Sequence, residues 1–158
     1  MPTISHKDIN VQHSFLRSSL ALIATAVASA AATPSFAVEK SVAVTAIVEH
    51  KALDAVRDGV RDELKSAGFE AGKNLKYEYQ SAQGNTGTAA QIARKYVGER
   101  PDVIVAIATP SAQAVVAASK DIPIVYSAVA DPGAAKLVKG LEASGTNVTG
   151  VSDLSPLD

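Results

Sequence analysis

The sequence has no cysteine and no tryptophan, and only three of its 158 residues are phenylalanine and three are histidine. Without cysteine the chain can form no disulfide, no thiolate metal site and no lipid anchor on an N-terminal cysteine. The histidines are scattered, with His6 and His13 close to the N-terminus, so we expect neither a metal nor another cofactor. A formal net charge of −1 gives no basic surface for nucleic acid.

Motifs of common enzymes are also missing. The sequence contains no nucleophile elbow, no phosphate-binding glycine loop followed by lysine, and no dinucleotide-binding glycine pattern. Only Glu49, His50 and Asp54 stand close enough together for acid–base work, because residues four apart at a helix start share one face. We therefore expect a protein without catalytic activity, and an exported enzyme that uses Glu49 and His50 is the minor alternative.

The first 37 residues have the pattern of a secretory signal peptide. Lys7 and Arg17 make the start positive, residues 20–32 are apolar and uncharged, and Ser35-Phe36-Ala37 supplies small residues for a cleavage site. The apolar run is shorter than the roughly 20 residues that a membrane span needs. We expect cleavage after Ala37 and a soluble periplasmic product that is not a lipoprotein.

Residues 38–158 are enough for one small domain. Apolar runs and alternation predict strands over 41–48, 74–80, 103–108, 122–125 and 147–152. Three- and four-residue spacing of apolar side chains predicts helices over 52–67, 88–99, 111–119 and 137–141. Strands that alternate with helices indicate an α/β domain with a mostly parallel five-stranded sheet. We expect a flavodoxin-like or Rossmann-like three-layer sandwich with the strand order 2-1-3-4-5.

The most informative stretch is the predicted buried strand 103–108 and the helix after it. Thr109 can cap that helix, and Pro110 suits its first position because proline lacks an N–H. The next N–H groups, those of Ser111 and Ala112, then lack partners and point towards the end of the strand. Such a helix start can bind an anion such as a carboxylate.

Other polar residues follow the other strands. In the predicted strand order, the connections that follow strands one and three run to opposite faces of the sheet. Ligands bind at such a topological switch point. Glu49 and His50 follow strand one there, while Gln83 and the loop from Ser127 to Asp131 open on the same edge. His50 can equally be an exposed helix-start residue, and Asp131 can equally fix a turn.

Five segments together resemble a known family. They are ALDAVRDGV, SAQG, IVAIATPSAQA, DIPIVYSAVADP and GTNVTGVSD, and they span Ser41 to Asp153 in order. The sequence is similar to the periplasmic substrate-binding proteins of ABC importers, the family that includes the tryptophan-binding proteins. The resemblance implies one lobe of a type I periplasmic-binding-protein fold, a small-molecule ligand such as an amino acid, and a permease in the inner membrane as partner.

The resemblance also assigns roles at the loops. Thr109, Ser111 and the helix start are expected to hold a ligand carboxylate, with amide hydrogen bonds from Gln83 and Gln113. Glu49 or His50 is expected near the ligand's amino group or side chain. Aromatic stacking needs a tyrosine such as Tyr126, or a second lobe. The candidate ligand-binding residues are Glu49, His50, Gln83, Thr109, Pro110, Ser111, Gln113, Ser127 and Asp131.

In this family the chain continues well beyond the segment matched here. The resemblance therefore implies that residues 38–158 are the N-terminal lobe alone, so that binding is impaired. We expect self-association through a surface around Val148 and Val151 that the rest of the protein normally covers. A sensing or adaptor lobe that docks on a membrane receptor is the alternative function.

Overall fold

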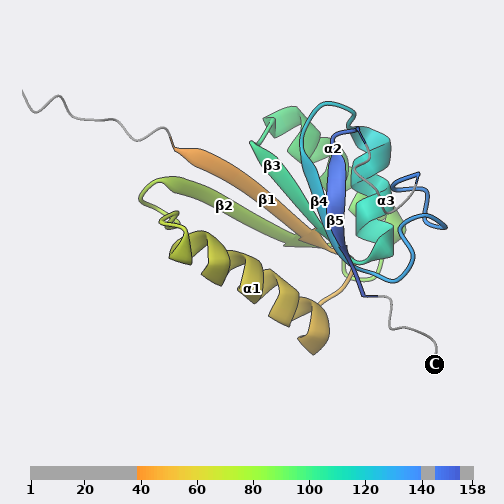
Figure 1. The fold of residues 1–158 in the computed structure, drawn as a ribbon, viewed down its shortest axis with the longest axis horizontal. Helices are drawn as coiled ribbons and strands as arrows, with labels where there is room; N and C mark the ends of the chain where they lie inside the picture. The colour runs from red at the N-terminus through yellow and green to blue at the C-terminus, as the bar shows by residue number, and fades with distance from the viewer. Residues whose placement is uncertain (1–38, 140–144, 154–158) are drawn as a thin grey trace, which may run out of the picture. The chain divides into compact units, whose positions relative to one another are not determined.

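The computed structural model describes residues 39–139 and 145–153, so the predicted signal peptide lies outside the described residues. Strands and helices alternate along the chain (Figure 1). In order they are β1 (Lys40–Ala46), α1 (Lys51–Ser66), β2 (Leu75–Ser81), α2 (Thr86–Glu99), β3 (Val103–Ile107), α3 (Thr109–Ala118), β4 (Ile124–Val129) and β5 (Val148–Ser152).

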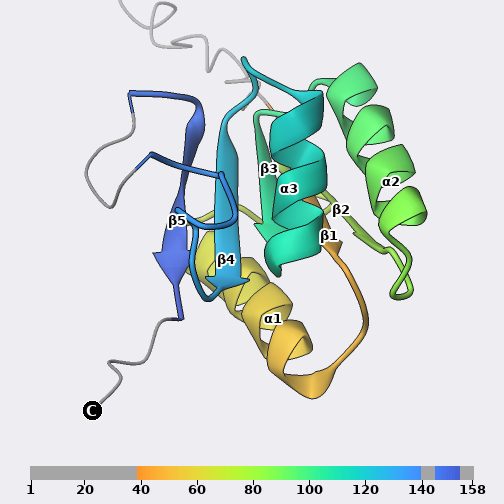
Figure 2. The same cartoon turned by 90° about the vertical axis from the view of Figure 1, so that its right-hand side faces the viewer.

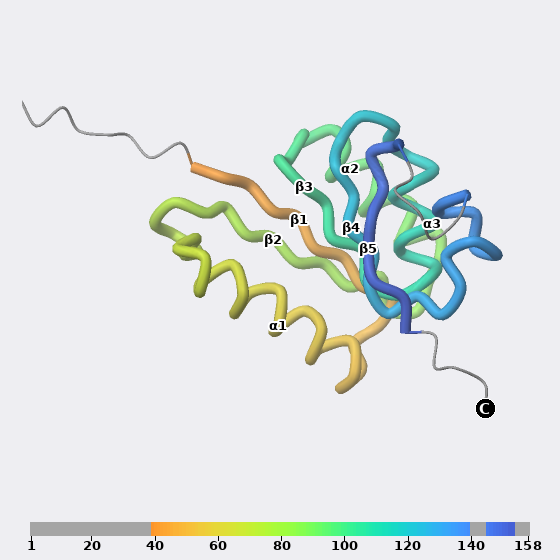
Figure 3. The backbone as a smooth tube through the Cα atoms, viewed as in Figure 1, coloured from red at the N-terminus to blue at the C-terminus, as the bar shows by residue number. Residues whose placement is uncertain are grey.

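The five strands form one parallel sheet in the order β2-β1-β3-β4-β5, which confirms the predicted α/β class and strand order. Val44 of β1 is paired with Tyr79 of β2 on one side and with Val105 of β3 on the other. The backbone trace shows β5 at one border of the sheet and β2 at the other (Figure 3). Because all strands are parallel, their carboxyl ends share one edge.

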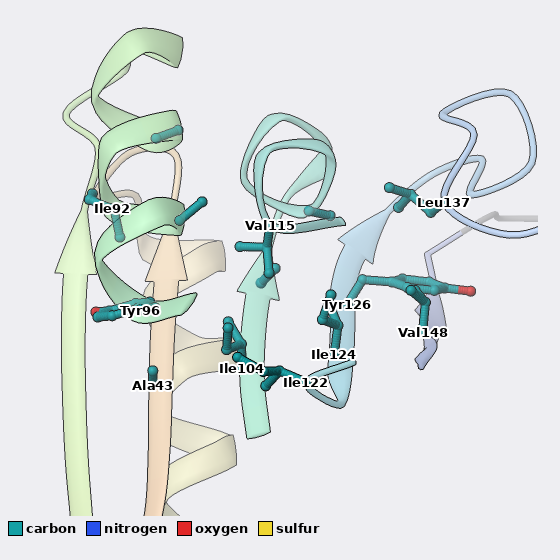
Figure 4. Close-up of a cluster of buried hydrophobic side chains, with 14 of the residues drawn as sticks. Ala43, Ile92, Tyr96, Ile104, Val115, Ile122, Ile124, Tyr126, Leu137 and Val148 are labelled. Carbon is teal, nitrogen blue, oxygen red and sulfur yellow. The ribbon is translucent and has the colours of Figure 1, made fainter. Parts of the chain in front are cut away.

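Helices α2 and α3 lie side by side on one face of the sheet (Figure 2). The core beneath them includes the inward residues predicted for α2, namely Ala89, Ile92, Ala93 and Tyr96, and all four are buried. Figure 4 shows the Tyr96 ring lying between the helix and the sheet. Its hydroxyl donates to the Val44 carbonyl oxygen at 3.1 Å, and burial raises the Tyr96 pKa far above its ordinary value.

Helix α1 covers the opposite face. Leu53, Val56, Val60 and Leu64 form the predicted apolar stripe and pack against the sheet, yet no residue of this helix is fully buried. Ala67, which the periodicity placed in the stripe, is exposed at the C-cap. The outer side of α1 carries ion pairs, including Arg57 with Asp54 at 3.2 Å. This face of the sheet is therefore less completely covered than the other.

Two predicted elements differ from the structure, one in its bounds and one in its type. The fourth strand, predicted over 122–125, is present but runs from Ile124 to Val129, with a register shift after Tyr126. Pro123 has no N–H to donate to the sheet, and only its carbonyl oxygen pairs, by accepting from the Ile104 N–H. The helix expected over 137–141 is absent from the part that the structure describes, up to residue 139. Hydrogen-bonded turns occupy the residues before this position. The Asp131 side chain accepts from the Ala134 N–H, and the Asp131 carbonyl oxygen accepts from the Ala135 N–H.

Candidate functional site

The carboxyl ends of β1 and β3 lie next to each other at the centre of the sheet edge. The chain leaves β1 for α1 on one face and leaves β3 for α3 on the other, as Figure 1 shows. Connections that diverge in this way leave a crevice at the edge of an open parallel sheet, which is where such sheets bind ligands. The predicted position of the switch point, between strands one and three, is confirmed.

The start of α3 differs in detail from the expectation. Ala108 occupies the cap position, so Thr109 is the first helical residue and Pro110 the second. The Ala112 N–H donates to the Ala108 carbonyl oxygen at 3.1 Å, and it is therefore not free as predicted. The N–H groups that precede the first intrahelical bond belong to Thr109 and Ser111, because Pro110 has none. Both groups belong to the turn that follows β3 directly.

Helix α3 lacks the side-chain cap that the other two described helices have. His50 Nδ1 accepts from the Ala52 N–H at 3.3 Å in α1, and Asn85 Oδ1 accepts from the Thr88 N–H at 2.9 Å in α2. No side chain caps α3, and its first turn has no acidic residue. The partial positive charge of this helix start is consequently uncompensated within the described residues.

Ser111 adds a second feature at the same place. The residue is fully buried, and its Oγ has no hydrogen-bond partner among the described residues. A buried hydroxyl without a partner is costly, by about 1–3 kcal/mol, so native proteins usually supply one. The Ser111 hydroxyl and the free N–H groups of the same turn together form a donor set suited to an anion.

Three of the five described non-glycine residues with positive φ follow or end a strand at this edge. Ala108 has φ 72° and ψ 154°, a conformation that is essentially confined to glycine. Gln83, shortly after β2, has φ 52°, and Ala128, near the end of β4, has φ 54°. Strained residues of this kind cost roughly 1–3 kcal/mol each and cluster at ligand sites. The sequence gives no sign of this strain, because none of the three positions is a glycine.

Thr45 is a candidate that the sequence analysis missed. It lies one residue before the end of β1, is paired with Ala106, and is almost fully buried. Its Oγ1, like that of Ser111, has no hydrogen-bond partner in the described part of the chain. In the apolar run SVAVTAIV a threonine is indistinguishable from a strand-filling β-branched residue, so only the structure singles it out.

The proposed acid–base group does not assemble in this structure. Glu49 is exposed, and His50 uses its Nδ1 to cap α1, as the helix-start interpretation predicted. The Asp54 carboxylate lies 3.2 Å from Arg57 Nη1, and the Asp54 N–H donates to the His50 carbonyl oxygen. Asp54 thus pairs with Arg57. The arrangement of Glu49, His50 and Asp54 gives no support to the minor enzymatic alternative.

The remaining candidates have identifiable structural partners. Gln113 donates through Nε2 to the Ala135 carbonyl oxygen at 3.1 Å, which ties α3 to the turn segment. Asp131 fixes that turn, in agreement with the alternative stated for it. The Ser127 carbonyl accepts from Ala108 N–H at 2.9 Å and thereby holds the strained residue. Gln83 is exposed shortly after β2, and its N–H donates to Ser81 Oγ at 3.2 Å.

Tyr126 cannot stack on a ligand in this conformation. It is 5% exposed and lies in the core beside Leu137 and Val148 (Figure 4). Within the described ranges, we find no cluster of histidine and acidic residues that could hold a metal ion. No helix in the same ranges has the length and apolar character required to cross a bilayer.

The chain is similar to known substrate-binding proteins. Residues 41–158 match the family model described as ABC transporter substrate binding protein. A tyrosine-binding protein of Clostridioides difficile (strain R20291) is 44% identical over 120 residues, which is 76% of this chain and 35% of that protein. The chain thus spans little more than a third of this curated relative.

Solved structures give the same picture. A conserved domain protein of Vibrio cholerae has a TM-score of 0.73 and 63% identity, and the match covers 74% of this chain and 40% of that one. An open, ligand-free substrate-binding protein with adhesive properties from Clostridium difficile has a TM-score of 0.73 and 48% identity, over 75% and 40% of the two chains. An ABC domain from Streptococcus pneumonia in complex with L-Trp has a TM-score of 0.71 and 35% identity, over 73% and 39%. The chain belongs to the ABC transporter substrate binding protein family.

Proposed function

We propose that this chain is the N-terminal lobe of an extracytoplasmic amino-acid-binding protein, and that it holds the ligand's carboxylate at the start of α3. One observation carries the proposal: among the described residues, α3 begins without a side-chain cap, on a strained alanine, and the buried Ser111 hydroxyl has no partner. A carboxylate would accept hydrogen bonds from this hydroxyl and from the free N–H groups. Such a ligand would satisfy the groups for which the described part of the chain offers no partner.

An aromatic amino acid is the ligand that the relatives favour. One relative is a tyrosine-binding protein, and another was crystallised in complex with L-Trp. Tyr126 is buried in the core, so the ring of such a ligand would have to find its contacts elsewhere in the protein. Glu49 and Gln83 are exposed, follow β1 and β2, and are the proposed partners of the ligand's polar groups.

Transport supplies the partner and the location. Outside the cytoplasm, proteins of this family deliver their ligands to the membrane permease of an ABC transporter. We propose the same for this protein. The N-terminal pattern of residues 1–37 supports export by a cleaved signal peptide. Two lobes closing on the ligand would bury it and signal the loaded state.

A chimera tests the assignment. Residues 39–153 would replace the matching stretch of the tyrosine-binding relative, so that both parts of the binding protein are present. Isothermal titration with L-tyrosine should show binding, and Ser111→Ala or Thr109→Val should each weaken it roughly tenfold to a hundredfold, because hydrogen bonds to a charged acceptor contribute about 1.5–3 kcal/mol.

Ser66→Ala is the matched control. Ser66 ends α1 at the opposite edge of the sheet, and its Oγ donates to the Asp62 carbonyl oxygen. This variant should bind as the unsubstituted chimera does. Unchanged affinity in both Ser111→Ala and Thr109→Val, or a folded chimera that does not bind at all, would refute the assignment.

A further inference from the structure

Strand β2 forms one border of the sheet, and its outer edge is open. Within the described residues it pairs with β1 alone, apart from a bridge between Leu75 and Ala71 at its start (Figure 3). An open edge presents main-chain N–H and C=O groups that can pair with another strand. Sheets often block such an edge with a proline or a bulge, but β2 contains no proline and its register with β1 is regular throughout. The edge is therefore free to accept a further strand.

The main-chain groups of Tyr77 and Tyr79 point away from the sheet. In a parallel pair, the groups of every second residue face the neighbouring strand. The Ala82 N–H, just after β2, donates to the Ala46 carbonyl oxygen of β1 at 2.8 Å. The even-numbered residues of β2 consequently face β1, and the odd-numbered residues face outwards. Both tyrosine side chains are half-buried and pack in the cluster beneath α1.

The opposite face of β2 carries two opposite charges, two residues apart. Lys76 is exposed and forms no ion pair within the described residues. The Glu78 carboxylate pairs with Lys95 of α2, and its side chain is still 28% exposed. Lys95 also pairs with Glu99 at 3.1 Å. Glu78 is therefore held in place by α2 and can still be reached by a second cation.

An antiparallel copy of β2 complements this pattern when the two strands are centred on Tyr77. The two Tyr77 residues then lie opposite each other and exchange two N–H···O=C bonds through their outward-facing groups. On the other face, Lys76 of each copy lies opposite Glu78 of the other, at a pair position where side chains come close. Opposite charges at such a position stabilise a strand pair. The strand is thus complementary to itself.

Other registers lose this complementarity. A pair centred on Lys76 places two ammonium groups opposite each other, and a pair centred on Glu78 does the same with two carboxylates. Like charges directly opposite each other destabilise a strand pair. A pair centred on Tyr79 places Glu78 opposite Gln80 and forms no ion pair. The charges therefore select one register, and they disfavour pairing with an unrelated strand.

We propose that β2 is an interface between two copies of this chain, which join their sheets edge to edge through antiparallel β2 strands centred on Tyr77. Because the paired strands run in opposite directions, the crevices of the two copies open towards opposite ends and neither blocks the other. Strand β5 lies at the other border of the sheet. The interface is therefore separate from the exposed surface at Val151.

Single cysteines test the register, because the 158-residue chain has no cysteine of its own. In the proposed pair the two Tyr77 Cα atoms lie about 5.5 Å apart, a separation that suits a disulfide. Tyr79, on the same face, lies opposite Leu75 of the other copy and far from its own counterpart. Under mild oxidation Tyr77→Cys should form a disulfide-linked dimer, and Tyr79→Cys should form roughly tenfold less. Both variants carry Val151→Lys, so that the exposed valine does not contribute.

Charge reversal tests the ion pairs by a different measurement. Lys76→Glu and Glu78→Lys each place like charges opposite each other, and each should raise the dissociation constant of the dimer roughly tenfold or more in sedimentation velocity. An equimolar mixture of the two variants should form a mixed dimer, because opposite charges then meet at both positions. Lys51→Glu makes the same charge change at an exposed residue of α1 and should dimerise normally.

Three results would overturn the proposal. They are equal disulfide formation by the two cysteine variants, a mixture of folded charge variants that stays monomeric, and a chain that remains monomeric at high concentration. Equal loss of dimer in Lys51→Glu would also overturn it, because the net charge and not the register would then control association. If a charge variant fails to fold, the two cysteine variants decide the matter.

Discussion

Asp102 fastens the beginnings of β1 and β3 together. Its carboxylate accepts from the Ser41 hydroxyl and the Ser41 N–H, both at 2.8 Å, and pairs with Lys40 Nζ at 3.2 Å. These contacts, led by the Ser41 hydroxyl, lower the pKa of Asp102 from 3.8 to about 2. A depressed folded-state pKa stabilises the protein above the unfolded pKa, and the stabilisation is lost as the pH falls through about 2.

Asp102→Asn should therefore change the acid branch of the stability curve. At neutral pH the variant should be less stable by roughly 1 kcal/mol, because the carboxylate is substantially exposed and solvent screens its interactions. Between about pH 4 and pH 2 the wild type should lose stability more steeply than the variant. Urea unfolding at several pH values measures both, and parallel curves would contradict the role given to Asp102.

Gly150 in β5 is required by a neighbouring backbone. A Cβ at this position would lie 2.3 Å from the Tyr126 carbonyl oxygen and 2.5 Å from Tyr126 Cγ. Because the closest atom belongs to the main chain of β4, Gly150→Ala should displace β5 and cost about 1–3 kcal/mol. Gly72→Ala is an unsuitable control because φ is 81° there, whereas Gly98→Ala meets open space. Thermal unfolding in which Gly150→Ala and Gly98→Ala behave alike would show that β5 tolerates the methyl group.

At the start of α3, the proposed binding of a ligand and the stability of the helix make opposite demands on the sequence. Ala108 adopts a conformation suited to glycine, so Ala108→Gly should remove strain and raise the free energy of unfolding by about 1 kcal/mol. In contrast, Asn85→Ala removes the cap of α2 and should lower it by about 1 kcal/mol. Chemical denaturation distinguishes the two signs, and destabilisation by Ala108→Gly would mean that the alanine is not strained.

At this scale the sequence predicts much of the fold and less of the site. The inward face of α2 and the order of the strands follow from periodicity and from the handedness of crossovers. The start of β4 is not predictable from apolar runs, because Ile122 is buried without belonging to the strand. Helix α3 begins at Thr109 because Ala108, in a strained conformation, takes the cap position. An alanine in the sequence gives no indication of that conformation.

The exposed surface is also only partly predictable. Val148 and Val151 are two apolar residues of the same short strand, and both are expected at an open surface. In the structure Val148 is 4% exposed and packs in the core, while Val151 is 67% exposed. The expectation is wrong for Val148, because a strand sends successive side chains to opposite faces and one face of this sheet is covered.

For the whole molecule, the isolated chain should associate with itself weakly. Val56, Val60 and Leu64 of α1 line an open cavity with Val125 and the exposed Val151, and water penalises such an apolar surface. Val151→Lys should reduce this association without unfolding the chain, because the side chain is largely in solvent. Sedimentation velocity over a range of concentrations measures the effect, and a monodisperse wild type at high concentration would contradict the predicted association.

The isolated chain should also bind its ligand weakly. With one lobe, one side of the ligand stays in water, and contacts to an exposed helix start contribute only about 0.3–1 kcal/mol each. Micromolar binding requires about 8 kcal/mol, so millimolar dissociation constants are expected. Micromolar affinity of a monomeric chain in a calorimetric titration would mean that one lobe is sufficient.

The central claim is that the start of α3 binds a carboxylate, and amide chemical shifts of the isotope-labelled chain test it even at millimolar affinity. L-tyrosine and tyramine share the ring and the amino group, but tyramine has no carboxylate. Titration with L-tyrosine should move the amide signals of Thr109 and Ser111, and tyramine at the same concentrations should leave them in place. Equal shifts with both compounds, or shifts with L-tyrosine confined to other parts of the chain, would contradict the account.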